Sequence, residues 1–213
     1  MALSKLAANS FDLTDNYALT GTVTGVTSTQ KIFLIKNIDA SSSNTVDFVN
    51  GSNSVVLDNT YKTYLFKFVN IHPSNNATRL QYNLSVDGGS NYNVAKTTTS
   101  FKAYHNEGDS ATALTYETGT DLAQGTGTQF IGDDISNAND ASMSGEMFLF
   151  NPSSTTFVKH IITITSTLAN GDFAVWNSTG TGYGNTTSAV DAVQFTMSSG
   201  TIDSGRIALY GIK

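Results

Sequence analysis

The sequence predicts an all-β protein, a sandwich or a barrel of short strands. Two observations carry this prediction. Short apolar runs with a period of two residues alternate with clusters of Ser, Asn, Gly and Asp, and no stretch sustains the 3.6-residue repeat of an amphipathic helix. Charged residues make up only 13% of the 213 residues, about half the usual share. Uncharged hydroxyl and amide side chains therefore carry solubility, which suits sheet surfaces and turns better than long helices.

The clearest strand is predicted at residues 78–87. One of its faces is apolar and consists of Leu80, Tyr82, Leu84 and Val86, while the other is polar. This alternation is typical of a half-buried strand. Asp87-Gly88-Gly89 follows, and its glycines permit positive φ, so the sequence predicts a turn and a hairpin-type reversal there.

Other strands follow from the same pattern. In residues 61–71 one face carries Tyr64, Phe66 and Phe68, and the strand should end at His72-Pro73, since proline cannot donate to a strand ladder. Further strands are predicted at residues 31–36, 146–150, 157–165, 173–176, 193–197 and 206–212. Between them, residues 39–44 and 177–185 are predicted to be polar spacers.

The last strand, residues 206–212, is apolar on both faces, with Ile207 and Leu209 on one and Ala208, Tyr210 and Ile212 on the other. This predicts a central strand, or one covered by a neighbouring subunit. Ser204-Gly205 is predicted to form the turn into it, and residues 193–197 to be its hairpin partner.

Two regions are less strongly patterned. Residues 93–139 contain one or two predicted strands, near 97–105 and 111–116, within long excursions that are either functional or structured. Residues 1–25 are predicted to be an extended arm that orders against a partner, and residues 26–213 a single β-sandwich domain. The arm's candidate assembly residues are Leu6, Phe11, Leu13 and Tyr17.

Composition argues against several classes of function. The net charge is −6 and the basic residues are scattered, so no nucleic-acid partner is expected. There is no cysteine, which rules out disulfides and thiolate metal sites. No apolar run approaches the roughly 20 residues of a membrane span, so no membrane insertion is expected.

No motif for catalysis, a cofactor or a metal stands out. Phosphate-binding loops, nucleophile elbows, zinc pairs and dinucleotide fingerprints are missing, and no cofactor is expected. His72, His105 and His160 show no ligand spacing and are predicted at the surface or at strand edges; His160 alternates with Val158 and Ile162, which indicates partial burial. Residues 133–140 are rich in oxygen but fail the EF-hand pattern, and a solvated polar loop is the prediction.

One stretch suggests binding. Residues 176–185 are rich in glycine and hold the only tryptophan, and the candidate glycan contacts are Trp176, Asn177, Tyr183 and Asn185. Aromatic rings would stack on a sugar while amides and hydroxyls bind it. The alternative interpretation, which we favour, is that Trp176 ends a strand and packs, and that the glycines only permit a turn.

Several stretches resemble, in order and spacing, a domain found in structural proteins of tailed bacteriophages, often tail-fibre or virion proteins. They are NTYKTY at 59–64, VNIHP at 69–73, VDGGSNY at 86–92, FKAYH at 101–105, LFNPSS at 149–154, NTTSA at 185–189 and LYGIK at 209–213. The resemblance covers about residues 30–213. It implies a jelly-roll-like sandwich displayed on the virion, oligomeric and often trimeric, and it brings no catalytic residues.

The functional expectation is a non-enzymatic structural protein of a tailed-phage virion, on the particle surface as a capsid decoration or as a tail or fibre component. Its partners would be other virion proteins and further copies of itself. An adhesin that recognises host surface glycans is the alternative, and a glycan-cleaving enzyme is a third and weaker one. The long shaft of a tail fibre does not precede the shared domain in this chain.

Overall fold

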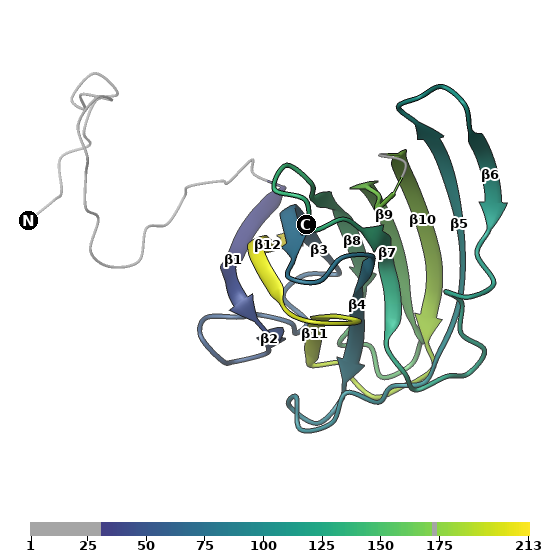
Figure 1. Cartoon of the computed structure of the whole chain (residues 1–213). Coiled ribbons are helices and arrows are strands. Elements are labelled where there is room, and N and C mark those ends of the chain that lie inside the picture. Colours follow the sequence, from purple (N-terminus) through teal and green to yellow (C-terminus); the bar gives the residue numbers. More distant parts are fainter. Residues whose placement is uncertain (1–30, 172–173) are drawn as a thin grey trace, which may run out of the picture. The chain divides into compact units, whose positions relative to one another are not determined.

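The structure, a computed structural model, describes residues 31–171 and 174–213. The described residues form twelve β-strands and no helix, in two antiparallel sheets that pack together (Figure 1). The prediction of an all-β sandwich is confirmed. The strands are β1 (Ile32–Ser43), β2 (Thr45–Val49), β3 (Thr63–Pro73), β4 (Thr78–Ser85), β5 (Lys96–Asn106), β6 (Thr112–Tyr116), β7 (Gln129–Ile135), β8 (Met143–Phe150), β9 (Lys159–Leu168), β10 (Ala174–Gly184), β11 (Ala192–Met197) and β12 (Ile202–Ile212).

Eight of the strands have the order of a jelly roll. In the larger sheet β1, β12, β3 and β8 lie side by side, and the smaller sheet has the order β2, β11, β4, β7. Along these eight strands the chain changes sheet at every step except that from β4 to β7. This alternation is the double Greek key that defines a jelly roll.

The other four strands are two hairpins inserted into the jelly roll. Hairpin β5–β6 lies in the chain between β4 and β7, and hairpin β9–β10 between β8 and β11. Because β9 pairs with β8 and β10 pairs with β5, the hairpins extend the larger sheet to eight strands. We call β5, β6, β9 and β10 the wing; its outermost strands, β5 and β6, lie on the right of Figure 1.

The core lies between the two sheets of the jelly roll. The alternating residues Tyr64, Phe66 and Phe68 of β3, and Leu80, Tyr82 and Leu84 of β4, point into it and are at most 2% exposed. Phe195 of β11 is at its centre: its ring contacts Phe66 edge to face, with centroids 5.2 Å apart, and Phe68 at 5.3 Å. The predicted faces of these strands are confirmed, and the edge-to-face geometry adds to the gain from burying the rings.

The turn after β4 is confirmed, but the hairpin is not. Gly88 and Gly89 have φ of 70° and 80°, and Asp87 accepts hydrogen bonds from Ser85 Oγ at 2.7 Å and from the Asn91 amide at 2.9 Å. Beyond the turn the chain passes to β5 in the other sheet and does not return along β4. The strand already ends at Ser85, so Val86 lies in the turn and is 37% exposed.

The closing strand β12 is central, as predicted, because it pairs with β1 on one side and β3 on the other. Its predicted hairpin with β11 is wrong: β11 belongs to the smaller sheet, where it pairs with β2 and β4. Ser204 and Gly205 are also not a turn. They lie inside β12, where the pairing register with β3 shifts.

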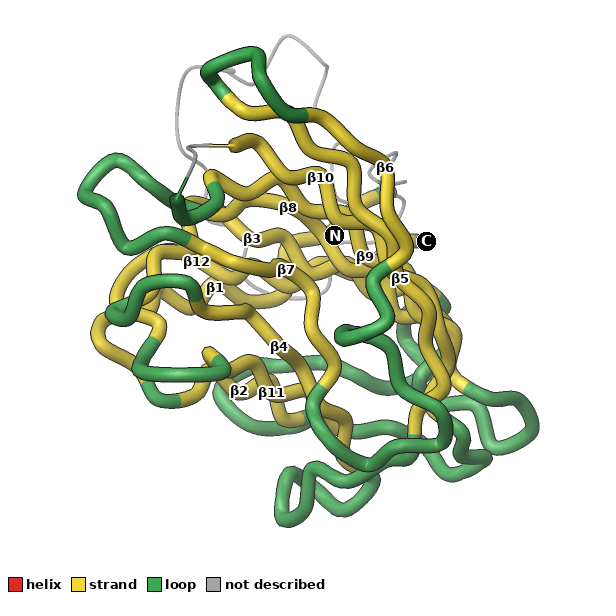
Figure 2. Tube along the Cα trace, turned by 45° about the vertical axis from the view of Figure 1, so that its right-hand side comes forward, coloured by secondary structure: helices red, strands yellow, loops and turns green. Residues whose placement is uncertain are grey.

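Some strand segments were not predicted because they are rich in serine, threonine and other polar residues. Strand β1 continues to Ser43 through the predicted spacer at 39–44, because its partner β12 is long enough to pair with it down to Ile202. Strands β2 and β7 were also missed. Figure 2 shows the loops that connect the strands.

Two lysines are fully buried on the inner side of the wing. Lys96 of β5 and Lys159 of β9 are each opposite Gly184 of β10, on its two sides. Lys159 Nζ donates to three backbone carbonyls, those of Ser154, Phe157 and Thr186, at 2.7 to 3.1 Å. Lys96 Nζ donates to Asn83 Oδ1 at 2.6 Å and to Val94 O at 2.8 Å. Burial lowers the pKa of both ammonium groups.

Candidate functional site

The glycine-rich stretch predicted as a loop at 177–185 is a strand. Its residues up to Gly184 belong to β10, which pairs with β9 on one side and β5 on the other. The glycines serve close strand packing and make no turn: a Cβ on Gly182 would lie 2.6 Å from Thr97 O. The loop interpretation is therefore wrong, and the glycine spacing that suggested it belongs to the middle of a sheet.

Trp176 and Tyr183 do not share a surface. They are seven residues apart in one extended strand, so their side chains point to opposite faces of the sheet, about 23 Å apart along it. Asn177 lies on the same face as Tyr183 but near the other end of the strand. Asn185 follows the strand, and its Nδ2 donates to Gln124 Oε1 at 2.6 Å. The four predicted glycan contacts do not form one site.

The second predicted set, the arm residues Leu6, Phe11, Leu13 and Tyr17, lies outside the described residues. Their assembly role stays a prediction.

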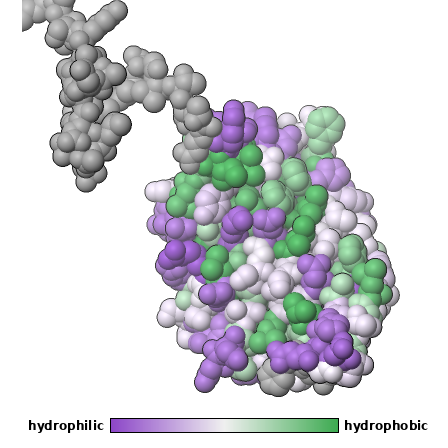
Figure 3. Space-filling model, turned by 90° about the horizontal axis from the view of Figure 1, so that it is seen from above, coloured by the Kyte–Doolittle hydropathy of each residue, from purple (hydrophilic) through white to green (hydrophobic). Residues whose placement is uncertain are grey.

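The outer face of the wing, which points away from the smaller sheet, carries exposed apolar side chains. It holds Leu114 (72% exposed), Tyr116 (54%), Val175 (52%), Phe101 (47%), Ile164 (42%) and Ile162 (38%). The register aligns Tyr116, Phe101, Thr179 and Ile164 in one row across its four strands. Seen from above in Figure 3, apolar residues reach the surface in several groups between polar ones.

In β9 the usual sidedness is inverted over most of the strand. Thr163, Thr165 and Thr167 point inward and are at most 4% exposed, while Ile162 and Ile164 point outward. A shift of one residue would have put Ile162 and Ile164 inside and the buried Ile161 outside. The buried hydroxyls have a cost: Thr165 Oγ1 donates to Ile131 O at 2.9 Å, but Thr167 Oγ1 has no hydrogen-bond partner among the described residues.

The strands of the wing present no Asp, Glu, Lys or Arg on this outer face. Its titratable groups are two histidines and the phenols of Tyr116 and Tyr183. His105 Nε2 lies 3.1 Å from Asp109 Oδ1, and His160 packs against the Tyr183 ring. Both histidines are exposed, so the predicted partial burial of His160 is wrong. The His160 side chain lies on the outer face of β9 with Ile162 and Ile164, and not on the inner face with the threonines.

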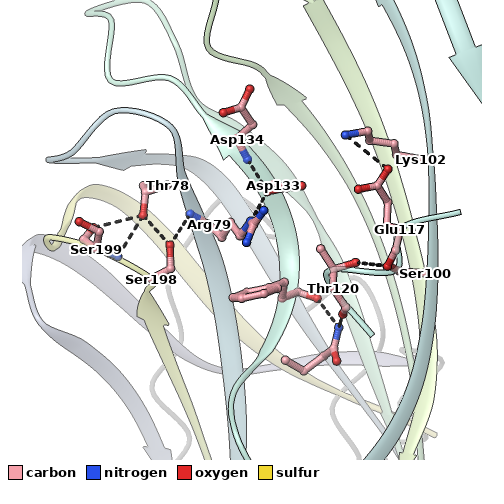
Figure 4. A network of polar contacts seen from close by, with 12 residues as sticks. Thr78, Arg79, Ser100, Lys102, Glu117, Thr120, Asp133, Asp134, Ser198 and Ser199 are labelled. Atoms are coloured by element: carbon pink, nitrogen blue, oxygen red, sulfur yellow. Dashed lines mark hydrogen bonds and ion pairs between the residues drawn. The ribbon is translucent and has the colours of Figure 1, made fainter. Parts of the chain in front are cut away.

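Figure 4 shows polar contacts on the inner side of the wing and, facing them, on the smaller sheet. Lys102 Nζ lies 3.4 Å from Glu117 Oε1, and Ser100 is hydrogen-bonded to Thr120. Opposite them, Arg79 of β4 pairs with Asp133 of β7. The carboxylates of Glu117 and Asp133 are thus each paired with a cation.

Asp134 is the carboxylate of this region with a shifted pKa. Its burial, and then the neighbouring Asp133 carboxylate, raise the pKa, while Lys102 and Arg79 oppose the shift. Asp133 and Asp134 lie in strand β7, so the predicted polar loop at 133–140 begins only after Ile135. Within residues 31–171 and 174–213, no group of three or more His, Asp or Glu side chains is placed to hold a metal ion.

Trp176 packs on the inner side of the wing, as the favoured interpretation predicted, although within a strand. Its ring centroid lies 6.2 Å from that of Tyr104, and Lys102 Nζ lies 3.4 Å above its face. One face of the indole is therefore taken by an ammonium group, an arrangement that stabilises both partners.

The apolar residues of β5 and β6 were not singled out from the sequence. Phe101, Leu114 and Tyr116 lie in the weakly patterned region 93–139, and no opposing polar face marks their side as outer. The signal that was available is their spacing: Leu114 and Tyr116 alternate with Ala113 and Thr115, as β-strand faces do.

Fold and surface together define a jelly-roll β-sandwich with a four-stranded wing whose outer face carries exposed apolar side chains and no Asp, Glu, Lys or Arg in its strands. No protein-family model matches the chain, and neither the curated proteins nor the solved structures contain a significant match. No helix in the described part of the chain is long and apolar enough to cross a membrane.

Proposed function

We propose that this chain is a non-enzymatic structural protein of a tailed-phage virion, displayed on the particle surface as a capsid decoration or as a tail or fibre component. The resemblance of its sequence stretches to phage structural proteins supports the virion. The jelly roll supports an architectural role, although the same fold hosts many functions. The wing supplies a surface for docking.

The observation that carries the proposal is the partial inversion of β9. A strand facing water on one side is expected to keep its isoleucines in the core and its threonines in water. Here Ile161 is buried as expected, but Ile162 and Ile164 face out while three threonines are buried. Such a pattern supports a face that a partner covers in the assembled state, because exposed apolar area of this kind marks interaction sites.

The experiment is to locate the protein on particles. Purified phage from a host expressing a tagged copy is labelled with gold-conjugated antibody and imaged. Label on the icosahedral shell supports a decoration protein, and label on the tail supports a tail or fibre component. Particles that carry no copies of the chain would overturn the proposal.

A truncated variant tests how the chain attaches. Without residues 1–25 the protein should keep the fold of residues 31–213, read from circular dichroism, and should no longer be incorporated. Wild-type levels of incorporation would remove the arm from the docking mechanism and leave the wing as the attachment surface.

The glycan-binding adhesin is a second candidate, supported by the aromatic pair Trp176 and Tyr104 on the inner side of the wing. Both side chains are half-buried, which leaves part of each ring for stacking. Binding on a glycan array that is lost in Tyr104→Ala, with the folded state retained, would favour the adhesin. The absence of binding by the wild-type chain to host surface glycans would count against it.

A further inference from the structure

We infer that two copies of this chain associate through the outer faces of their wings, sheet against sheet. The inference rests on the proposed docking role of the wing and names its partner as a second copy of the chain. The surface concerned is the outer side of β9, β10, β5 and β6 with its six exposed apolar residues.

The shape of the surface suits another sheet. Within the wing the side chains of Tyr116, Phe101, Thr179 and Ile164 form a continuous row across all four strands. Leu114 and Val175 lie on the same face beside that row. Two sheets pack face to face through such rows, with side chains of one filling the spaces of the other.

The distribution of charged residues argues for a second copy at this face and against a partner that is recognised by its charge. The chain carries a net charge of −6, so two copies repel each other where their charged surfaces meet. The wing's outer face has no Asp, Glu, Lys or Arg in its strands. Two copies that meet there bury no charged side chain of these strands, which removes the desolvation cost that charged groups would impose.

The area is close to what a stable dimer needs. Strands β5, β9 and β10 have 10 or 11 residues and β6 has 5. At about 3.3 Å per residue and about 4.8 Å between strands, they give roughly 600 Å² of flat area, to which side-chain relief adds. A standard interface takes about 800 Å² from each partner. The same face of the larger sheet continues onto the jelly roll, where Ile32, Leu34 and Val69 are about half exposed.

The twofold arrangement makes the surface self-complementary. In such an interface every contact occurs twice, so each exposed apolar residue of the face is buried in both copies. Leu114, at 72% exposed, would be the side chain that gains most from burial.

The test is sedimentation of the purified full chain over about a hundredfold range of concentration. We expect a monomer–dimer equilibrium that Leu114→Asp weakens by about tenfold or more, because the substitution would place a charge among apolar side chains at the interface. The matched control is Phe157→Asp, because Phe157 is 67% exposed but lies in the loop before β9, outside this face. It should leave the dimer unchanged.

A second measurement uses cross-linking. The chain has no cysteine, so a single introduced cysteine is the only thiol in each copy. A single Asn177→Cys, between Val175 and Thr179 on this face, should allow a cross-link between copies with a short thiol-reactive linker. The matched Ser90→Cys, in the turn after β4, should not. Circular dichroism confirms that each variant folds.

A wild-type chain that stays monomeric, a dimer that Leu114→Asp leaves intact, or a trimer would each overturn the face-to-face pairing. A monomer that is still incorporated into particles overturns the pairing alone, and would place another protein of the particle on the wing. Absence from particles together with a wing-dependent dimer would overturn only the proposed function.

Discussion

The ammonium nitrogen of Lys102 lies 3.4 Å from the centroid of the Trp176 ring and 3.4 Å from Glu117 Oε1. Lys102 belongs to β5, Trp176 to β10, and Glu117 follows β6, so one cation joins three parts of the wing. The Lys102 and Glu117 side chains are only 14% and 21% exposed. A pair this sheltered is screened less by salt than a surface pair.

The first prediction is that Lys102→Met lowers the free energy of unfolding by about 1–3 kcal/mol, because the cation–π contact is lost and the Glu117 carboxylate loses its cation. It should also change the emission of Trp176, the only tryptophan. Urea unfolding followed by that emission measures both. Lys67→Met is the control, since the Lys67–Glu146 pair on β3 and β8 is more exposed. Equal effects of the two variants would contradict the contact.

The second prediction compares two buried threonines of β9. Thr165 Oγ1 donates to Ile131 O at 2.9 Å, whereas Thr167 Oγ1 has no partner among the described residues. Thr165→Val should therefore cost about 1 kcal/mol of stability, and Thr167→Val should be neutral or stabilise by up to about 1 kcal/mol. Thermal unfolding of the two variants measures this difference. Equal losses would mean that Thr167 is hydrogen-bonded.

The third prediction concerns Gly145 in β8. A Cβ at this position would lie against Ile164 O and 2.7 Å from Thr165 Cα, both backbone atoms of β9 that cannot turn aside. Gly145→Ala should lower stability by about 1–3 kcal/mol, the usual cost of overpacking. Gly127→Ala is the control, because nothing lies within 4 Å of its added Cβ. A midpoint of urea unfolding that moves equally in both variants would refute the close approach.

Much of the jelly roll could be predicted because its strands have one apolar and one polar face. Leu80, Tyr82 and Leu84 alternate with polar residues, and the smaller sheet does bury that side. The order of the strands could not be predicted. The run at 193–197 and the run at 206–212 are neighbours in the sequence, but their connection crosses between the sheets, and local composition does not distinguish this path from a hairpin turn.

The wing could not be predicted for a different reason. Residues 177–184 have the Ser, Thr and Gly content of a loop. What makes them a strand is pairing with the preceding strand β9 and with β5, which is distant in the sequence and itself weakly patterned. The same limit explains the missed surface. Alternation in β9 separates Ile162 and Ile164 from Thr163, Thr165 and Thr167, but it does not say which of these two sets faces the core when tertiary context overrides the usual preference.

The fourth prediction is a pH dependence that comes from Lys96. Burial lowers the pKa of its ammonium group from 10.5 in the unfolded chain to about 8 in the fold. Between these values the unfolded state binds a proton that the folded state does not, so the free energy of unfolding increases as pH rises through this window. Below about pH 8 the buried charge is present and its desolvation opposes folding.

Lys96→Met removes this titration and serves as the reference. The stability of the wild type relative to Lys96→Met should increase by about 2 kcal/mol between pH 8 and pH 10, at about 1.4 kcal/mol per unit of differential protonation. Burial raises the pKa of Tyr82, which affects both chains alike and cancels in the difference. A flat difference between the wild type and Lys96→Met across this range would mean that the Lys96 amine, with Asn83 Oδ1 and Val94 O as its acceptors, keeps its charge in the fold as readily as in water.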